Sequence, residues 1–349
     1  MLKAVFTDYK LNFLKPSGTS RGTLYQKPSW FLKVWDINDP SAYGIGECAP
    51  IEGLSIDPIS FMDQKLKELT ENINNHENID LKDYPSIQFG LETALLDLKN
   101  GGEKVIFKNQ FSKGHQEIYI NGLIWMGNKE SMIDQVKSKI DDGFRCLKLK
   151  IGAINFDEEL SIIQSIRKQF NKDELELRLD ANGAFDLETA KNKLNQLSKY
   201  QIHSIEQPIY PGQFDKMKAL CLTSPIPIAL DEELISIKDA KKKEDLISYI
   251  QPQYIILKPG LLGGFKKTQE WINAAEKNNI SWWITSALES NIGLNAIAQF
   301  TAQFKNPLPQ GLGTGKIYTN NIPSFLELNG EHLKINNELN WNDSMLTFK

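Results

Sequence analysis

The stretch that decides the fold is residues 145–180, RCLKLKIGAINFDEELSIIQSIRKQFNKDELELRLD. Two runs in it, 145–150 and 175–180, alternate polar and apolar side chains with the period of a β-strand. Between them, residues 156–170 place apolar side chains at helical spacing. A strand, a helix and a second strand in this order predict parallel strands joined by a crossover helix.

The same unit recurs from residue 119 to residue 315. Further strands are expected at 204–206, 226–231, 254–258 and 282–286. The strand ends follow one another every 25–30 residues, up to Gly311. This near-constant period, repeated at least six times, favours a closed β/α barrel over a doubly wound sheet. A doubly wound sheet would also carry a glycine-rich phosphate loop after an early strand, and the glycine cluster at 260–264 is weak evidence for one.

The first hundred residues have a different pattern, which predicts an α+β unit. Strand-like stretches at 4–13 and 30–35 flank a polar segment, 15–27, which we expect to be a loop over a functional site. Apolar spacing predicts helices over 57–75 and 87–98. The second helix is expected to end at an asparagine followed by two glycines.

The composition excludes several classes of protein. Of 349 residues, 41% are hydrophobic and 24% charged, and the 40 basic and 44 acidic side chains give a net charge of −4, so we expect no nucleic-acid partner. No apolar run approaches the length of a membrane span, and the N-terminus lacks the apolar core of a signal peptide, so we expect no membrane partner and a cytoplasmic location. Three distant cysteines predict no disulfide framework, and four scattered histidines disfavour Ser-His-Asp chemistry.

Charged side chains stand at the predicted strand ends, where β/α barrels hold their active sites. Leu147 and Leu149 suit the helix layer, so the residues that alternate with them must point inward. The same argument applied to the other strands gives this inward set: Lys148, Lys150, Arg178, Asp180, Asn182, Asp231 and Lys258.

Carboxylates end three successive strands at Asp180, Glu206 and Asp231. They would repel one another unless a cation lay between them, and oxygen ligands favour Mg²⁺ above Mn²⁺. Lys150 and Lys258 would flank this cation, with pKa values lowered by it, and could remove or return a proton. The pattern predicts proton abstraction α to a carboxylate, with the metal stabilising the enediolate.

Five motifs in this order resemble the enolase superfamily, in its muconate-cycloisomerase-like branch with lysines on the second and sixth strands. They are KLK at 148–150, LDANGAF at 179–185, IEQP at 205–208, ALDEE at 229–233 and LKPG at 257–260. The resemblance covers nearly the whole chain. It implies a (β/α)7β barrel over 113–315, and an α+β capping domain over 1–112 that the tail, 316–349, completes.

The resemblance also implies roles for single residues. Asp180, Glu206 and Asp231 would hold Mg²⁺, or Mn²⁺ in its place. Lys150 would be the acid and base, and Lys258 would face the substrate from the other side. Lys148 would tune the pKa of Lys150 or hold a metal ligand, and Asn182 and Glu232 would support the ligands from behind. The expected substrate contacts are Ser20, Arg21, Arg178, Ser286, Gly311 and Gly313.

Within this branch, details of the sequence are similar to the o-succinylbenzoate synthase family. These are TSRG at 19–22, INGL at 120–123 and TSALESNIG at 285–293. The Asp-x-Asp that dipeptide epimerases usually carry after the seventh strand is absent, and no histidine lies between His203 and His332, as mandelate racemase-like enzymes require.

The implied reaction is dehydration of 2-succinyl-6-hydroxy-2,4-cyclohexadiene-1-carboxylate to o-succinylbenzoate, a step toward menaquinone. The expected partner is therefore a small-molecule carboxylate. Racemisation of an N-acylamino acid and epimerisation of a dipeptide stay open, because the same lysines would serve them. A non-catalytic barrel that binds an acidic metabolite also stays open, as does a homo-oligomeric state.

Overall fold

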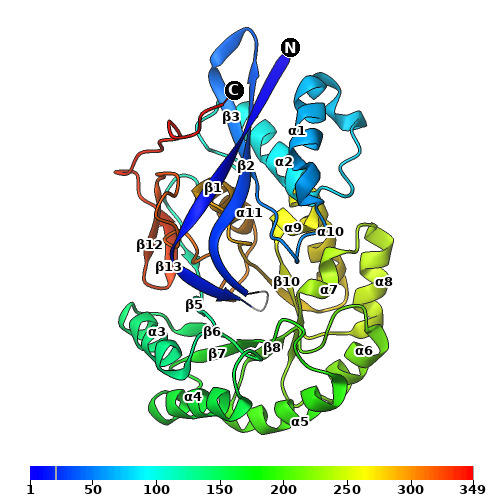
Figure 1. Ribbon diagram of the computed structural model, residues 1–349, viewed down its shortest axis with the longest axis vertical. Helices are drawn as coiled ribbons and strands as arrows, with labels where there is room; N and C mark the ends of the chain where they lie inside the picture. Colours follow the sequence, from blue (N-terminus) through cyan, green and yellow to red (C-terminus); the bar gives the residue numbers. More distant parts are fainter. Residues whose placement is uncertain (20–21, 349) are drawn as a thin grey trace.

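The strands predicted in the second half of the chain assemble into a single curled parallel sheet (Figure 1). The computed structural model describes residues 1–19 and 22–348, and in them the sheet has seven strands in the order β11-β10-β9-β8-β7-β6-β5. Neighbours in the sheet are thus neighbours in the chain. The strands are β5 (Gly122–Ile124), β6 (Cys146–Lys150), β7 (Glu176–Asp180), β8 (Ser204–Glu206), β9 (Ile228–Leu230), β10 (Tyr254–Leu257) and β11 (Ser281–Ile284).

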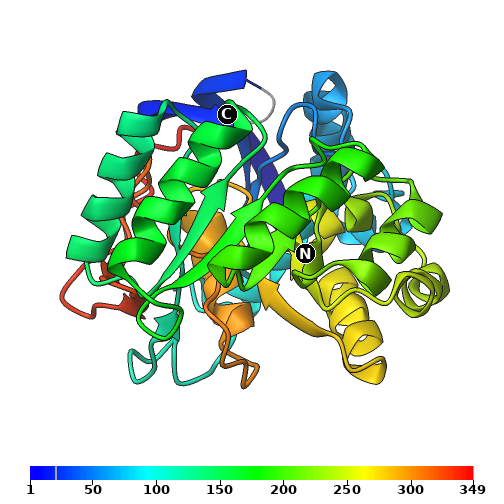
Figure 2. The same ribbon diagram turned by 90° about the horizontal axis from the view of Figure 1, so that it is seen from below.

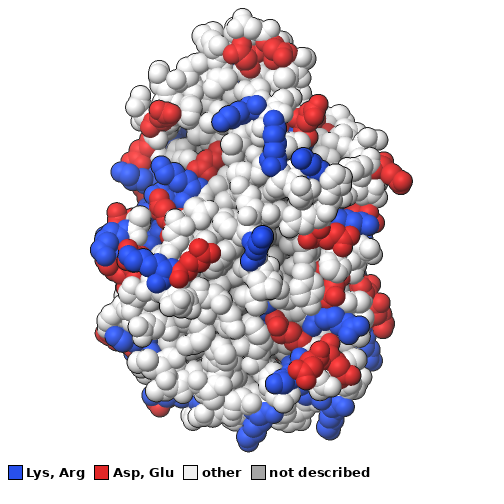
Figure 3. Space-filling model, turned by 180° about the vertical axis from the view of Figure 1, so that it is seen from behind, with Lys and Arg blue, Asp and Glu red and all other residues white. Residues whose placement is uncertain are grey.

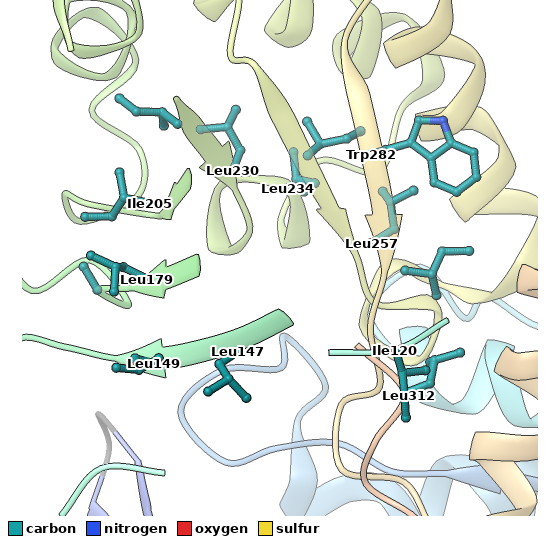
Figure 4. Packing of buried hydrophobic residues seen from close by; sticks show 14 of the residues in the cluster. Ile120, Leu147, Leu149, Leu179, Ile205, Leu230, Leu234, Leu257, Trp282 and Leu312 are labelled. Carbon is teal, nitrogen blue, oxygen red and sulfur yellow. The ribbon is translucent and has the colours of Figure 1, made fainter. Parts of the chain in front are cut away.

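Helices cover the outer face of this sheet, as Figures 1 and 2 show. They are α3 (Lys129–Asp141), α4 (Phe156–Gln169), α5 (Leu187–Leu197), η3 (Ser198–Tyr200), α6 (Phe214–Thr223), α8 (Ala240–Ile250), α10 (Gly264–Lys277) and α11 (Asn291–Thr301). The short helices α7 (Glu232–Ile235) and α9 (Pro259–Leu262) follow the carboxyl ends of β9 and β10. Strand leucines such as Leu147, Leu179 and Leu257 are fully buried in one core cluster with these helices (Figure 4). Burial of each such side chain stabilises the fold by about 1.5–3 kcal/mol. The predicted alternation is confirmed, because the lysines of β6 point to the opposite face.

Residues 310–311 connect the end of β11, at one edge of the curled sheet, with residues 119–121, which lead into β5 at the other edge. Gly311 N–H donates to the Ile284 carbonyl and Gln310 N–H donates to the Tyr119 carbonyl, each at 2.8 Å. A Cβ at Gly311 would lie 2.1 Å from Thr285 Oγ1, so only glycine allows this approach. Single-residue bridges make the connection in the described chain, and the coarser description, a curled parallel sheet, is the one the strands support.

The N-terminal region is an antiparallel sheet with two helices on one face. Its strands are β1 (Leu2–Thr19), β2 (Gly22–Asp36) and β3 (Asp39–Cys48), and its helices are α1 (Met62–Glu71) and α2 (Pro85–Lys99). The predicted loop at 15–27 is wrong. Its described residues, 15–19 and 22–27, belong to β1 and β2, with a register shift between Asn12 and Ser17, because ladder hydrogen bonds between backbones tolerate polar side chains.

The predicted helix over 57–75 is also wrong in its extent. The 3₁₀ helix η1 (Ile59–Phe61) precedes α1, and a second one, η2 (Ile73–Asn78), follows it. Asn72 separates α1 from η2 with a non-helical φ of −115° and ψ of 26°. Local backbone geometry at Asn72 thus divides an apolar pattern that is continuous in the sequence.

The C-terminal tail returns to the N-terminal sheet, and the two chain ends lie at the same end of the molecule (Figure 1). Thr319 N–H donates to the Asn12 carbonyl at 2.9 Å, and Leu346 packs with Phe31 in one buried cluster. Between these two contacts in the chain, β12 (Leu326–Asn329) pairs with β13 (His332–Ile335), and β13 pairs with β4 (Ile118–Tyr119). The domain boundaries at residues 112 and 315 stay a prediction.

Basic and acidic side chains are interspersed on the face shown in Figure 3. Among the helices of the described residues, none combines the length and the apolar character needed to cross a bilayer.

Candidate active site

A pocket lies at the carboxyl ends of the parallel strands, where the N-terminal region approaches them. Strand ends on opposite sides of the sheet contribute Lys150 and Lys258 to its wall. The predicted residues that line it are Lys148, Lys150, Asp180, Asn182, Lys258, Ser286, Gly311 and Gly313. The structure therefore brings together most of the site expected from the strand ends.

Lys150, the last residue of β6, is held at the pocket by two acceptors. Its Nζ donates to Asp180 Oδ2 at 3.0 Å and to Asn182 Oδ1 at 2.7 Å. Asn182 in turn donates from Nδ2 to Glu232 Oε1 at 3.0 Å. The amine is thereby fixed at the pocket wall, and Asn182 and Glu232 lie where the sequence placed supporting residues.

Lys148 lies two residues deeper along the same strand and joins two carboxylates. Its Nζ is 3.0 Å from Asp180 Oδ2 and 2.5 Å from Glu206 Oε2. Burial alone lowers the pKa of Lys148, but the Asp180 and Glu206 charges outweigh it and raise that pKa above its ordinary value. Asp180 shows the converse: burial raises its pKa, and the ammonium groups of Lys148 and Lys150 lower it further than burial raises it. Lys148 therefore holds carboxylates in place.

Lys258 forms an ion pair with Asp231 on the other side of the pocket. Burial lowers the pKa of Lys258, and the charges of Asp231, Glu206 and Glu232 together more than reverse this effect, so the net shift is upward. For Asp231, burial raises the pKa and Lys258 lowers it, and the net shift is downward. The expected lowering of the Lys258 pKa depends on a bound cation and stays a prediction, and the charge of Asp231 acts in the opposite direction.

Glu206 is a buried carboxylate with one oxygen that accepts no hydrogen bond in the described residues. It is 2% exposed, and the oxygen without a partner is Oε1. Burial, and after it the nearby charge of Asp180, raises the pKa of Glu206 well above its ordinary range. An unsatisfied carboxylate oxygen beside Asp180 and Asp231 is a donor that suits a hard divalent cation.

The positive charge beside the three carboxylates comes from lysines, whereas the sequence analysis expected it from a metal ion. In this structure, amines of Lys148, Lys150 and Lys258 neutralise Asp180, Glu206 and Asp231. Among the residues described, no group of three or more His, Cys, Asp or Glu side chains is arranged so that it could hold a metal ion. Binding of a metal would therefore require these amines to release the carboxylates.

Arg178, a predicted substrate contact, does not line the pocket. It lies two residues before Asp180 on β7 and is 1% exposed. Its Nε donates to Glu176 Oε1 at 2.7 Å, its Nη1 donates to the Pro309 carbonyl at 2.8 Å, and its guanidinium carbon lies 4.2 Å from the centre of the Trp283 ring. Inward alternation was predicted correctly, but depth along the strand places Arg178 below the pocket.

The remaining predicted substrate contacts divide into three cases. Ser286 lines the pocket, but its hydroxyl already donates to Glu289 at 2.6 Å and accepts from Thr314 at 2.9 Å. Gly311 and Gly313 line it as well, although Gly311 is explained by its approach to β11. The predictions for Ser20 and Arg21 lie outside the described residues.

Sequence reasoning missed the part of the wall that comes from outside the sheet. Leu24 of β2 and the residues Ile51, Glu52 and Leu54, which follow β3, all line the pocket, as does Trp125 after β5. The signal was an apolar pair, Ile51 and Leu54, in a segment with no strand or helix period. Two apolar side chains in such a segment indicate packing against another part of the molecule, but the sequence does not identify that part.

Comparison with known proteins agrees with this geometry. The family model described as "Enolase C-terminal domain-like" matches residues 131–339, and one described as "MenC, N-terminal domain" matches residues 23–98. The o-succinylbenzoate synthase of Desulfotalea psychrophila is 45% identical, over 92% of this chain and 95% of its own length.

Solved structures show the same relationship. MenC of Desulfotalea psychrophila superposes with a TM-score of 0.85 at 39% identity, and covers 96% of this chain and 99% of its own. The L-Ala-D/L-Glu epimerase of Bacillus subtilis superposes with a TM-score of 0.81 over 95% of each chain, at 20% identity, which shows a shared fold alone.

Proposed function

The chain belongs to the o-succinylbenzoate synthase family of the enolase superfamily, and on this premise we propose that it is a lyase that dehydrates 2-succinyl-6-hydroxy-2,4-cyclohexadiene-1-carboxylate. The product would be o-succinylbenzoate, which leads toward menaquinone. One observation carries the proposal. Lys150 and Lys258 line one pocket from strands β6 and β10, with the carboxylate-bearing strands between them.

Lys150 would be the base and then the acid. The C–H bond α to the substrate carboxylate breaks, and its proton passes to Nζ of neutral Lys150. The ring C–O bond then breaks, and the departing hydroxyl takes that proton from the same amine and leaves as water. Lys150 Nζ lies 3.0 Å from Asp180 Oδ2, so the amine must leave this carboxylate to reach the substrate proton.

Asp180, Glu206 and Asp231 would hold Mg²⁺, with Mn²⁺ as a substitute. The unpartnered Oε1 of Glu206 and the all-oxygen donor set support this assignment. A bound divalent ion supplies positive charge next to the enediolate oxygens. Asn182 and Glu232 would keep Lys150 and its neighbours in place while Lys148 releases its carboxylates.

Lys258 would face the substrate from the side opposite Lys150 and stabilise negative charge. The same position would let Lys258 exchange a proton, which keeps the racemase reaction as the alternative. Lys258→Arg separates the two, because arginine keeps the charge but is not readily deprotonated. We expect this variant to retain part of the dehydration and to lose α-proton exchange from its face, measured as deuterium uptake into an N-succinyl amino acid in heavy water.

The finer features of the fold are part of the proposal. We take residues 309–312 as the eighth strand of a (β/α)7β barrel, residues 1–112 as its capping domain and residues 316–349 as the returning tail. The hydrogen bonds of Gln310 and Gly311 to the two sheet edges support the first of these. Ser20 and Arg21 would contact the anionic substrate, Arg21 through charge-assisted hydrogen bonds.

The test is turnover of the purified protein with the dehydration substrate, with and without Mg²⁺. We expect turnover only with the metal, and none from Asp180→Ala. Asp186→Ala is the control, because Asp186 is exposed, caps α5 and does not line the pocket. Metal binding without turnover would instead indicate a binding protein, and normal turnover by Asp180→Ala would contradict the ligand assignment.

A further inference from the structure

The residue that follows Glu206 makes four side-chain hydrogen bonds beneath the pocket. Gln207 is fully buried and does not belong to the pocket wall as described. Its Oε1 accepts from the backbone N–H groups of Asp231 and Glu233, each at 3.2 Å. Its Nε2 donates to Glu233 Oε2 at 2.9 Å and to the Ile209 carbonyl at 3.1 Å. The amide therefore ties the end of β8 to the end of β9 and the start of α7.

The backbone of Gln207 extends the connection to a third strand. Its N–H donates to the Ala229 carbonyl of β9 at 2.9 Å, and its carbonyl accepts from Gly183 N–H at 2.7 Å. Gly183 lies in the turn that follows Asp180 of β7. One residue is thus bonded to the segments that carry Asp180, Glu206 and Asp231.

Gln207 holds these bonds in a strained backbone conformation. Its φ is +38°, in the left-handed region that disfavours residues with a Cβ. Asn182 and Leu288 also have positive φ values, after β7 and β11 at the same edge of the sheet. Glycine would adopt the conformation of Gln207 without strain but would supply none of the four side-chain bonds.

From these contacts we propose that Gln207 is a positioning residue, which sets the spacing of Asp180, Glu206 and Asp231 so that one divalent cation can bind all three. The proposal rests on the metal role assigned under the proposed function. The hydrogen bonds of the Gln207 side chain and backbone fix the chain next to Glu206 and at Asp231, and so fix the distance between the two carboxylates. Loss of such an outer contact typically weakens metal binding by roughly 10–100-fold.

Gln299 offers a matched control. It is also fully buried, in α11, and its side chain also makes four hydrogen bonds. Its Oε1 accepts from the N–H groups of Ile106 and Phe107 at 2.8 and 3.0 Å, and its Nε2 donates to the Lys104 carbonyl and Asn295 Oδ1 at 2.8 Å each. Gln299→Leu thus removes the same group from the same degree of burial, away from the pocket.

The experiment is titration of Mn²⁺ into the wild type, Gln207→Leu and Gln299→Leu, in which the electron paramagnetic resonance signal measures free Mn²⁺. Urea unfolding gives the stability of each protein. We expect Gln207→Leu to bind Mn²⁺ roughly 10–100-fold more weakly. Gln299→Leu should lose comparable stability and bind Mn²⁺ as the wild type does. If Gln207→Leu does not fold, Gln207→Met, which keeps the length of the side chain without its amide, takes its place with the same expectation.

Two outcomes overturn the positioning role while leaving the metal role intact. One is wild-type Mn²⁺ affinity in the Gln207 variant, and the other is equal loss of affinity in the Gln207 and Gln299 variants. Failure of the wild type itself to bind Mn²⁺ would overturn the metal role and this inference with it.

Discussion

Two side chains on the inner face of β7, Arg178 and Asp180, point in the same direction but have different surroundings. Asp180, at the carboxyl end, lies at a pocket with amines on either side of it. Arg178, two residues earlier, is enclosed by Glu176, the Pro309 carbonyl and the ring of Trp283. The comparison teaches that inward direction is a property of strand period, whereas access is a property of depth in the sheet.

The interior at the amino ends of the strands is filled by aromatic and aliphatic side chains. Ala229, Ile256 and Trp283 form a buried cluster there, with Tyr254 packed against it. The ring centres of His203 and Tyr254 lie 4.9 Å apart. Side chains at this end are therefore expected to affect stability, and those at the carboxyl end to affect turnover.

The largest expected effect is at the carboxyl end. Lys150→Ala should reduce the dehydration rate by at least about 10²–10⁴-fold, since a general base contributes that much and Lys150 would act in two steps. The measurement is kcat for the dehydration substrate, with urea unfolding as the check that the variant folds. Near wild-type turnover would show that the base is another residue, and that the carboxyl end of the sheet does not act through Lys150.

The next effect is at the amino end. Arg178→Met should lower the free energy of unfolding by about 3 kcal/mol, because it leaves Glu176 without its buried partner. The measurement is urea unfolding, paired with kcat per folded molecule, which should stay close to the wild-type value. A stable variant with lost turnover would show that Arg178 reaches the chemistry after all.

A pH dependence of stability should also originate at the amino end. Burial lowers the pKa of His203 to about 4, from 6.5. The native state then binds fewer protons than the unfolded chain between these values, so stability falls by about 3 kcal/mol as pH falls from 6.5 to 4. Unfolding free energies across this interval should decrease less steeply for His203→Phe than for the wild type. Identical slopes would contradict the assignment.

The smallest expected effect concerns the wall that the N-terminal sheet adds to the carboxyl end. Leu24→Ala removes apolar surface from the pocket, and should raise KM about threefold to tenfold with little change in kcat. Leu14→Ala is the control, since Leu14 lies on the other arm of the same hairpin and is 61% exposed. An equal change in both variants would indicate an effect on the hairpin itself.

Much of the fold and the site follows from local sequence. The period of 25–30 residues predicted the parallel strands, and alternation within β6 and β7 predicted the inward lysines and Asp180. These inferences succeed because strand geometry is set by the backbone and acts over a few residues. The segment 15–27 failed for the complementary reason: its polar side chains resemble a loop, while its backbone pairs across a hairpin.

By itself, then, the sequence determined which side chains point inward and in what order the charged strand ends follow. Tertiary structure alone decided which of them meet a pocket, that Lys148, Lys150 and Lys258 neutralise the three carboxylates, and that Leu24 and Ile51 complete the wall. Local periodicity gives direction within one strand, but depth, closure and ion pairing depend on segments far apart in the chain, which only packing brings together.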